Sequence, residues 1–586
     1  MAANGFEQFR RALVGPLSDA RAPLTPRSTY WSWFRAALAF QPVRPPLSGS
    51  LRFGSDLVDA DLVDADLVDA DLAGAPSARP SAPTPLSGPA VKPWRKGWTR
   101  LRHSGVAAAV SAALGVVAAI GSTGGYALYH HAQHGQEGFR QKHCGTSNPA
   151  LVTRADGECT GVTDGSDGPG VFGTALEPVL AALRAENREA TRGGRYVTVA
   201  FLAPLSSADA TNGQALDQLV AEAEGAYTAV EQANAADSST AKIRLVLAGM
   251  GSGERHWKDA VDQLKLERNL VAVTGMGLAR GESVDAAREL SDAGIPMVAD
   301  LITADGFDTG AVDDKGPIKG LVRVGFTNTA LLTAVGKELA GQKHTAAVVR
   351  SVTSNQSPDP YTESLYHDFL SLNGLKKHLL PEAGFPVDPR RGPNSFLNII
   401  GPLCDIAPAI DTVYFAAREK YLPDFLTALS QRPCRQRQLT VVTGSGTADL
   451  HLTTDALRRL DASITVLYAS LPTSTALQSD SNRDRSLYDD FLQAFTRDHH
   501  GQAFVAAHAT LGHSAVLAHD AVLTVATAIH QAATTATDLP GRYAVRDQLY
   551  TLTDNAVPGA GGRFGIDATG NRTTAPVTVN RLKGTP

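Results

Sequence analysis

The chain has 586 residues, 43% of them hydrophobic and 19% charged, which are globular values and allow two or three domains with buried cores. The formal net charge of −5 gives no electrostatic reason to expect nucleic acid as a partner.

Residues 1–90 are predicted to be a disordered tail, because segments rich in proline, serine and alanine flank a short acidic repeat. The repeat, "DLVDADLVDADLVDADLAGA" at 56–75, has a period of five and resembles the unit of pentapeptide-repeat proteins. Four such units would supply only about one coil of a β-helix, and a single coil cannot bury its leucines. We therefore expect a solvated tract on the cytoplasmic side.

Residues 91–130 are predicted to hold a basic flank and one transmembrane helix. No residue from 104 to 129 is charged, and that length exceeds the roughly 20 residues that a spanning helix needs. The flank "KPWRKGWTRLRH" is basic, which by the positive-inside rule leaves the N-terminus in the cytoplasm and later residues outside. A buried helix is the alternative, because the segment is rich in alanine. A translation start near Val91 would make it a secretory signal peptide and the protein secreted.

The four cysteines all follow this segment, and none stands in a CxxC pair, so no structural zinc site is predicted. Outside the cytoplasm these cysteines can oxidise. We predict the disulfides Cys144–Cys159 and Cys404–Cys434, because each closes a short loop, although sequence alone permits three connectivities. The first pair lies in residues 131–195, which we interpret as an extracytoplasmic lead-in that ends in a helix.

From Tyr196 onward, apolar runs of strand length alternate with segments of helical periodicity. "YVTVAFLAPL", "IRLVLAGM" and "LVAVTGMG" are typical of the strands, and "QALDQLVAEAEGAYTAVEQAN" is typical of the helices. Near-continuous apolar strands predict parallel sheets that are covered on both faces. The alternation pauses at "LVRVGFT" and "ITVLYAS", which predicts two α/β lobes with crossovers between them instead of one very wide sheet.

The turn "TGMGLARGES" follows the third of these strands and carries Gly275, Gly277 and Gly281. Its G-x-G-x-x-x-G spacing is one residue longer than the dinucleotide fingerprint, and it lacks the lysine of a P-loop. Nucleotide binding is therefore not predicted, nor is any other cofactor. Glycines before a helix do allow backbone N–H groups to approach a carboxylate or another acceptor-rich molecule. A plain tight turn without a ligand is the alternative.

The order of these segments resembles type I periplasmic binding proteins, the Leu/Ile/Val-binding-protein-like substrate-binding proteins of ABC transporters. "LVAVTGMGLA", "AARELSDAGIPMVA" and "LVRVGFTN" are similar to the first lobe of that family, and "YTESLYHDFLSLNGLKKH" is similar to the first helix of the second lobe. "AHDAVLTVATAI" and "GRFGIDATGNRTTAPVTVNRL" resemble its returning helix and closing hairpin. The lead-in and the disulfides look like a membrane-anchored subgroup from GC-rich bacteria.

The resemblance implies a two-lobed ligand-binding domain over 196–586 and no chemistry. Lobe 1 would span about 196–328 and 485–555, and lobe 2 about 329–484 and 556–586. Three strands would cross between the lobes, and a ligand would close the cleft by a hinge motion. The ligand contacts implied by the family are Gly275, Met276, Gly277, Leu278, Ala279, Leu301, Thr303, Tyr361, Arg418, Gly444 and Ser445.

The turn departs from the family pattern. Where amino-acid binders place serines for the ligand carboxylate, this chain has Leu278, Ala279 and Arg280. Arg280 either replaces those hydroxyls as a carboxylate partner or is solvated. A standard α-amino acid is therefore not a firm expectation for the ligand.

Other chemistry is not favoured by the sequence. His508, His513 and His519 have gaps of five and six residues, so they do not share a helix face, and no metal site is predicted. Asp300 and Asp305 could form a catalytic acid pair, but ligand binding or loop solvation is the preferred interpretation.

The function predicted from sequence is capture of a small solute, amino-acid-like or otherwise polar, outside the cytoplasm for an ABC-type permease. The protein would be single-pass in the cell membrane, with its C-terminal domain extracytoplasmic. The alternative is a membrane-anchored sensor or scaffold with a degenerate cleft, which binds partners through the tail.

Overall fold

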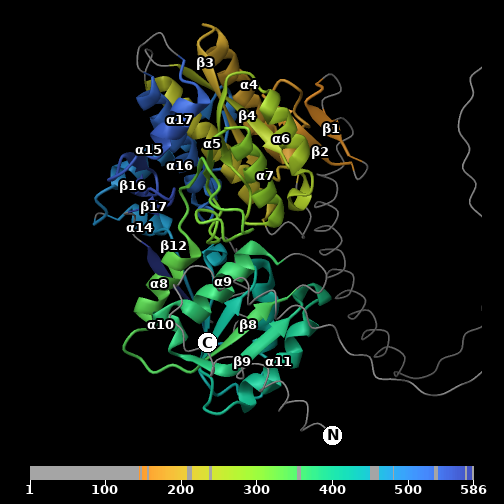
Figure 1. Cartoon of the computed structure of the whole chain (residues 1–586), viewed down its shortest axis with the longest axis vertical. Helices are drawn as coiled ribbons and strands as arrows, with labels where there is room; N and C mark the ends of the chain where they lie inside the picture. Colours follow the sequence, from red (N-terminus) through yellow and green to blue (C-terminus); the bar gives the residue numbers. More distant parts are fainter. Residues whose placement is uncertain are drawn as a thin grey trace, which may run out of the picture. The chain divides into compact units, whose positions relative to one another are not determined.

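The computed structural model describes Cys144 and residues 148–154, 157–206, 214–236, 241–352, 358–448, 461–479, 481–533, 539–573 and 577–583. These residues belong to one compact unit (Figure 1). The predicted tail at 1–90, its acidic repeat and the predicted membrane helix at 104–129 lie outside the described residues. A helix long and apolar enough to span a bilayer is not found among the residues described.

The first sheet has the order β1-β2-β4-β3-β5-β6-β7 in the described part of the chain. Its central strands are parallel, and β2 pairs antiparallel with both β1 and β4. The strands are β1 (Leu151–Thr153), β2 (Cys159–Thr163), β3 (Tyr196–Ala203), β4 (Lys242–Gly249), β5 (Leu270–Gly275), β6 (Met297–Ala299) and β7 (Leu321–Arg323). The apolar runs predicted as strands are thus confirmed. They are apolar throughout because a parallel strand that is covered on both faces buries nearly every residue, as β5 does.

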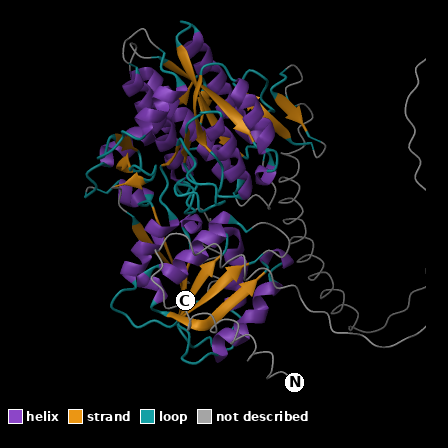
Figure 2. Ribbon diagram, viewed as in Figure 1, coloured by secondary structure: helices purple, strands orange, loops and turns teal. Residues whose placement is uncertain are grey.

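Helices cover this sheet, and we call the assembly lobe 1 (Figures 1 and 2). The helices are α4 (Glu177–Thr191), α5 (Leu216–Ala236), α6 (Trp257–Leu266), α7 (Gly281–Asp292), α15 (Arg485–Phe495), α16 (Ser514–Ala532) and α17 (Arg542–Leu549). The helices α5 and α16 pack closely, since a Cβ at Gly225 would come within 2.2 Å of the Ala515 carbonyl oxygen. Short 3-10 turns, η2 (Thr174–Leu176), η3 (Ser252–Glu254) and η7 (Ala506–Thr510), and the ribbon of β13 (Asp498–His499) and β14 (Gln502–Ala503) complete the lobe.

The second sheet has the order β18-β12-β11-β10-β8-β9 among the described residues, and we call it and its helices lobe 2. Its strands are β8 (Ala346–Ser351), β9 (Leu379–Val387), β10 (Thr412–Ala416), β11 (Leu439–Val442), β12 (Ile464–Ser470) and β18 (Thr578–Lys583). Its helices are α8 (Asn328–Glu338), α9 (Pro360–Ser371), α10 (Asn373–Lys376), α11 (Asn394–Asp405) and α12 (Leu422–Leu429), with turns η4 (Pro389–Arg391), η5 (Glu419–Tyr421) and η6 (Ser445–Ala448). The segment 453–460, which also has helical periodicity in the sequence, lies outside the described residues.

The chain passes between the two lobes after β7, after β12 and after β17, so the predicted two-lobed α/β arrangement with crossovers is confirmed. A short helix, α14 (Ser474–Leu477), follows the second passage. The third passage leads into β18, which runs antiparallel to β12.

Two boundaries differ from the sequence prediction. The described part of the lead-in, Cys144 and residues 148–154 and 157–195, is part of lobe 1, because β2 pairs with β4 and α4 packs on the same sheet. The strands β15 (Val557–Gly559), β16 (Gly562–Ile566) and β17 (Arg572–Thr573) also stay with lobe 1, although 556–586 was predicted to belong to lobe 2. Long-range contacts decide this placement: the buried Arg572 donates to the Val324 carbonyl and lies 3.6 Å from the Asp520 carboxylate.

The second sheet separates two hydrophobic cores. Along β8, Ala346 and Val348 join the core that runs on from lobe 1, whereas Ala347 and Val349 face a smaller core closed by α11 and α12. This alternation follows from the period of two in a strand.

Each lobe contains one disulfide, and both predicted pairs are confirmed. Cys144 is bonded to Cys159 at the start of lobe 1, and Cys404 of α11 is bonded to Cys434 beyond α12.

Candidate functional site

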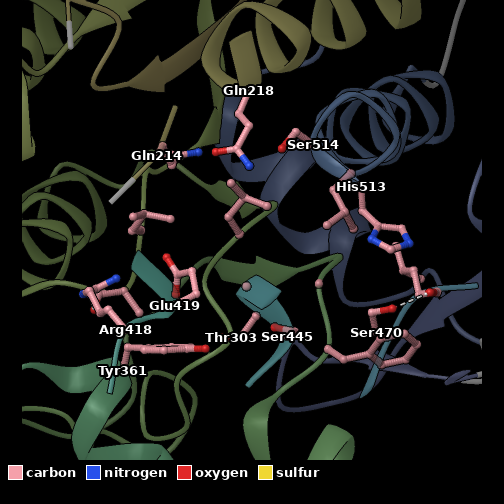
Figure 3. Close-up of a pocket in the computed structure, with 18 of the residues that line it drawn as sticks. Gln214, Gln218, Thr303, Tyr361, Arg418, Glu419, Ser445, Ser470, His513 and Ser514 are labelled. Carbon is pink, nitrogen blue, oxygen red and sulfur yellow. Dashed lines mark hydrogen bonds between the residues drawn. The ribbon is translucent and has the colours of Figure 1, made fainter. Parts of the chain in front are cut away.

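A cavity of about 400 Å³ lies where the carboxyl ends of strands from both sheets meet (Figure 3). Parallel α/β sheets place ligands at this edge, and the volume is within the range of small-molecule sites. Lobe 1 contributes the segment before and within α5, the turn after β5, the loop after β6 and the start of α16. Lobe 2 contributes the start of α9 and the segments after β10 and β11.

Many of the predicted ligand contacts converge on this cavity. Its lining includes Leu278, Ala279, Leu301, Thr303, Tyr361, Arg418 and Ser445. The other predicted contacts are outside the lining: they are Gly275, Met276, Gly277, Arg280 and Gly444. Binding of a ligand by any of these residues stays a prediction.

The predicted contacts outside the lining shape the site from behind. Gly275, Met276 and Gly277 all have positive φ angles, between 68° and 85°, which turn the chain sharply out of β5. Gly444 leaves space for the Tyr361 ring, since a Cβ there would lie 2.1 Å from the tyrosine oxygen. Arg280 points to Glu254, at 3.8 Å between its Nε and the carboxylate.

The lining also contains polar residues that the sequence analysis did not select. These are Gln214, Gln218, Glu419, Lys420, Ser470, His513 and Ser514. Gln214 precedes α5 and Gln218 lies in its first turn, while His513 and Ser514 are at the start of α16. The sequence signal that could have predicted them was therefore their position at the start of a helix. Figure 3 shows Gln218, Ser514 and His513 on one side of the cavity, with Tyr361, Arg418 and Glu419 on another.

Arg418 links the two lobes. Its Nη2 donates to the Ala279 carbonyl oxygen of lobe 1 at 2.8 Å and to Asp359 Oδ1 of lobe 2 at 2.7 Å. Its guanidinium also lies over the Tyr361 ring, 5.4 Å from the centroid. Burial opposes the charge of Arg418, which is only 6% exposed, but the neighbouring Asp359 and Glu419 raise its pKa above the ordinary value. The residue is therefore a charged, buried connection across the cavity wall.

Glu254 is buried behind the turn of residues 275–280, which we call the β5–α7 turn. Its Oε1 accepts a hydrogen bond from the Leu278 backbone N–H at 2.8 Å, and its Oε2 accepts one from Ser283 Oγ. Burial raises the pKa of Glu254 to about 6, although Arg280, Ser283 and the Leu278 N–H act in the opposite direction. The carboxyl is thus ionised at neutral pH in spite of having no exposed surface.

Lys420 is the second basic group of the lobe 2 wall. Burial, together with the charges of Arg280 and Arg418, lowers the pKa of its ammonium group to about 8. A small fall in local polarity on ligand entry would therefore favour its neutral form.

Asp300 and Asp305 are not among the residues that line the cavity. Burial raises the pKa of both carboxyls. The Asp300 Oδ1 accepts from the N–H of Leu301, while Asp305 Oδ2 accepts from Ser364 Oγ at 2.8 Å and from the Thr329 N–H. Asp305 therefore joins a loop of lobe 1 to α9 of lobe 2, and the two aspartates do not form an acid pair facing the cavity.

The histidines of residues 499–519 have separate partners. His508 contacts Glu224 at 2.7 Å, His519 contacts Gln232 at 2.7 Å, and His513 contacts the Pro472 carbonyl oxygen at 3.1 Å. Elsewhere in the described chain, Glu186, Glu189 and His500 offer ligand atoms within 4.8 Å of one another, and they could hold a cation.

No protein-family model matches the chain, and no curated protein matches it either. Solved structures that are similar include an ABC transporter substrate-binding protein from Desulfitobacterium hafniense in complex with leucine, at 17% identity and a TM-score of 0.48, covering 66% of this chain and 98% of the other. A leucine-binding protein from Thermotoga maritima has 16% identity, a TM-score of 0.46 and coverages of 66% and 95%. A solute-binding protein from Rhodopseudomonas palustris in complex with benzoate has 16% identity, a TM-score of 0.47 and coverages of 66% and 94%. These low identities and scores assign neither a family nor a ligand to this chain.

Proposed function

We propose that the chain is an extracytoplasmic binding protein that captures a small solute between its lobes and undertakes no chemistry. The observation that carries the proposal is the cavity of about 400 Å³, which is lined by strand ends of both sheets and lies beside the interlobe crossings. A molecule bound there touches both lobes at once. It therefore stabilises the arrangement in which the lobes are close, and binding is coupled to hinge closure.

The solute is small and amphipathic, either amino-acid-like or another polar molecule with an apolar part. Leu278, Leu301, Phe326 and Leu517 offer apolar surface, whereas Ser445, Gln214 and the charged residues of lobe 2 offer hydrogen bonds (the cavity lining contains all of these). Such a mixture of apolar surface with a few placed polar groups is characteristic of sites for small molecules.

The domain acts outside the cytoplasm, held at the cell membrane by residues 104–129, and delivers its solute to an ABC-type permease. The disulfides Cys144–Cys159 and Cys404–Cys434 support the extracytoplasmic placement, because such bonds persist in oxidising compartments. The scaffold alternative depends on residues 1–90, and no contact among the described residues favours it.

The proposal is tested by thermal unfolding of the purified full-length chain in the presence of amino acids, small peptides, sugars, nucleosides and small amides. A solute present at 100 times its Kd stabilises the folded state by about 2.7 kcal/mol through mass action. We expect saturable stabilisation by one chemical class, which is lost when Ser445 and Thr303 are replaced by bulky residues that fill the cavity. A complete lack of stabilisation across the library would contradict solute capture.

A further inference from the structure

The start of α7 is a position that would hold the anionic group of a ligand, and a side chain of the protein is already there. Backbone N–H groups at the start of a helix attract anions, and Leu278 and Ala279, which directly precede this helix, line the cavity. In the described structure, the carboxylate of Glu254 accepts hydrogen bonds from Leu278 N–H and Ser283 Oγ of this segment. Arg280 adds a guanidinium at 3.8 Å.

The backbone around Glu254 is bent so that this carboxylate reaches the turn. Gly251, Gly253 and Glu254 all have positive φ angles, and the value for Glu254 is 64°. A non-glycine residue with positive φ is uncommon, and such a conformation persists only where the surroundings enforce it. Gly277 completes the arrangement, because a Cβ there would lie 2.6 Å from Glu254 Oε1.

The β5–α7 turn is also engaged from the other lobe. The Ala279 carbonyl oxygen accepts from Arg418, and the charge of Arg418 is balanced by Asp359 at 2.7 Å. The guanidinium of Arg280 is similarly balanced by Glu254. The residues of the turn that line the cavity are Leu278 and Ala279.

We infer that Glu254 is a built-in occupant of the anion position at the start of α7, and that it excludes solutes that would place a carboxylate there. The solute class selected at this wall is uncharged: an amide, an alcohol or an apolar group. This inference about selection rests on the proposed function, whereas the occupancy of the anion position by Glu254 does not.

Occupancy is tested with formate on the Glu254→Ala variant of the full-length chain. Removal of the carboxylate leaves the Leu278 N–H, Ser283 and Arg280 without their anion, and formate is small enough to replace it. We expect formate to raise the melting temperature of Glu254→Ala saturably, with chloride at equal ionic strength having no such effect. Wild type should show no saturable response. The control variant Glu282→Ala, which removes a carboxylate from the first turn of α7, should show none either. An equal response of all three proteins would overturn the assignment.

Selection is tested with matched pairs of a carboxylate and its amide, namely isovalerate and isovaleramide, benzoate and benzamide, and leucine and leucinamide. Wild type is expected to bind the amide of a pair more tightly than the acid, and the preference should move toward the acid by about tenfold in Glu254→Ala, the size of a lost charged hydrogen bond. Preference of wild type for the acids, or an unchanged preference in the variant, would overturn the inference.

A second variant keeps both tests decisive if Glu254→Ala does not fold. Glu254→Gln retains the shape and the acceptor for Leu278 N–H but removes the charge, so its discrimination against acids should shrink, and an unchanged ratio would count against the inference. Failure of the proposed function has a different signature: no solute of either series stabilises wild type, while the formate response of Glu254→Ala is still present.

Discussion

The two lobes bring the same kind of edge to the cavity, the carboxyl ends of parallel strands, but they provide it with different chemistry. On the β5–α7 turn of lobe 1, the Leu278 N–H and the Ala279 carbonyl are bonded within the protein, and the apolar residues Leu278 and Ala279 line the cavity. On lobe 2, the segments after β10 and β11 present Glu419, Lys420 and Ser445. Shared topology thus fixes where a ligand can lie, and local side chains decide whether a given segment offers polar or apolar contacts. Lobe 1 offers polar side chains from other segments, among them Gln214, Gln218 and Thr303.

The largest effect is expected from removing the disulfide of each lobe in turn. Replacing Cys404 and Cys434 by serine releases a loop with a sequence separation of 30, for which the chain-entropy model gives a loss of roughly 3–4 kcal/mol in the free energy of unfolding. The matched control, serine at Cys144 and Cys159, releases a loop with a separation of 15 and should cost about 3 kcal/mol. Urea unfolding followed by circular dichroism measures both. A larger loss from the lobe 1 pair would contradict the ranking.

The second prediction removes the connection between the two walls. Arg418→Met leaves the Ala279 carbonyl and the partly buried Asp359 without their partner, so the free energy of unfolding should fall by roughly 2–4 kcal/mol. Arg435→Met, at an exposed position of the same lobe, serves as the control and should change stability by less than about 0.5 kcal/mol. Urea midpoints of the two variants would settle the difference, and similar midpoints would show that Arg418 does not connect the walls.

The third prediction uses pH to examine the lobe 1 wall. Burial raises the pKa of Glu254 from 4.5 to about 6, so the folded state holds this proton more tightly than the unfolded state does. Its stabilising contribution is therefore complete below about pH 4.5 and is lost as the pH rises through about 6, a change on the order of 2 kcal/mol. Glu254→Gln lacks the titration. Subtracting its unfolding free energies from those of wild type between pH 4 and 7.5 isolates the effect, and a flat difference would disprove it.

The smallest effect distinguishes the walls by affinity. Ser445→Ala removes a hydroxyl from the lobe 2 wall, and it should weaken the solute found in the screen by about fivefold, the value of one neutral hydrogen bond. Thr303→Val removes a hydroxyl on the lobe 1 side and should have a weaker effect. Calorimetric titration compares the two variants. A larger loss of affinity in Thr303→Val than in Ser445→Ala would show that lobe 1 provides the stronger of the two hydroxyl contacts.

The sequence predicted the elements whose determinants are local. The strands β3, β4 and β5 are apolar runs that are buried in parallel sheets, and Cys404 and Cys434 lie close enough in sequence for pairing by loop length. The lobe to which β15–β17 belong was not predictable in this way, because Arg572 finds its partners Asp520 and Val324 across long sequence separations.

The residues around the cavity were also predicted only in part, because some of their contacts join residues far apart in the sequence. Tyr361 and Arg418 were predicted because the resemblance to type I periplasmic binding proteins implied them as ligand contacts, and both line the cavity. Glu254 was missed because its target, Leu278, is 24 residues away, and only the fold brings the two together. The signal available was the pair Gly251 and Gly253 shortly before it, since closely spaced glycines permit a sharply bent backbone.

The pairing of β18 with β12 has a consequence for synthesis. Residues 464–470 form their strand long before residues 578–583 emerge from the ribosome, and the intervening chain builds part of lobe 1. During that interval the hydrogen-bonding groups along one side of β12 have no neighbour, and bare strand edges of this kind associate with other chains. We expect a nascent polypeptide of this design to need protection, for instance by a chaperone, until its closing strand arrives.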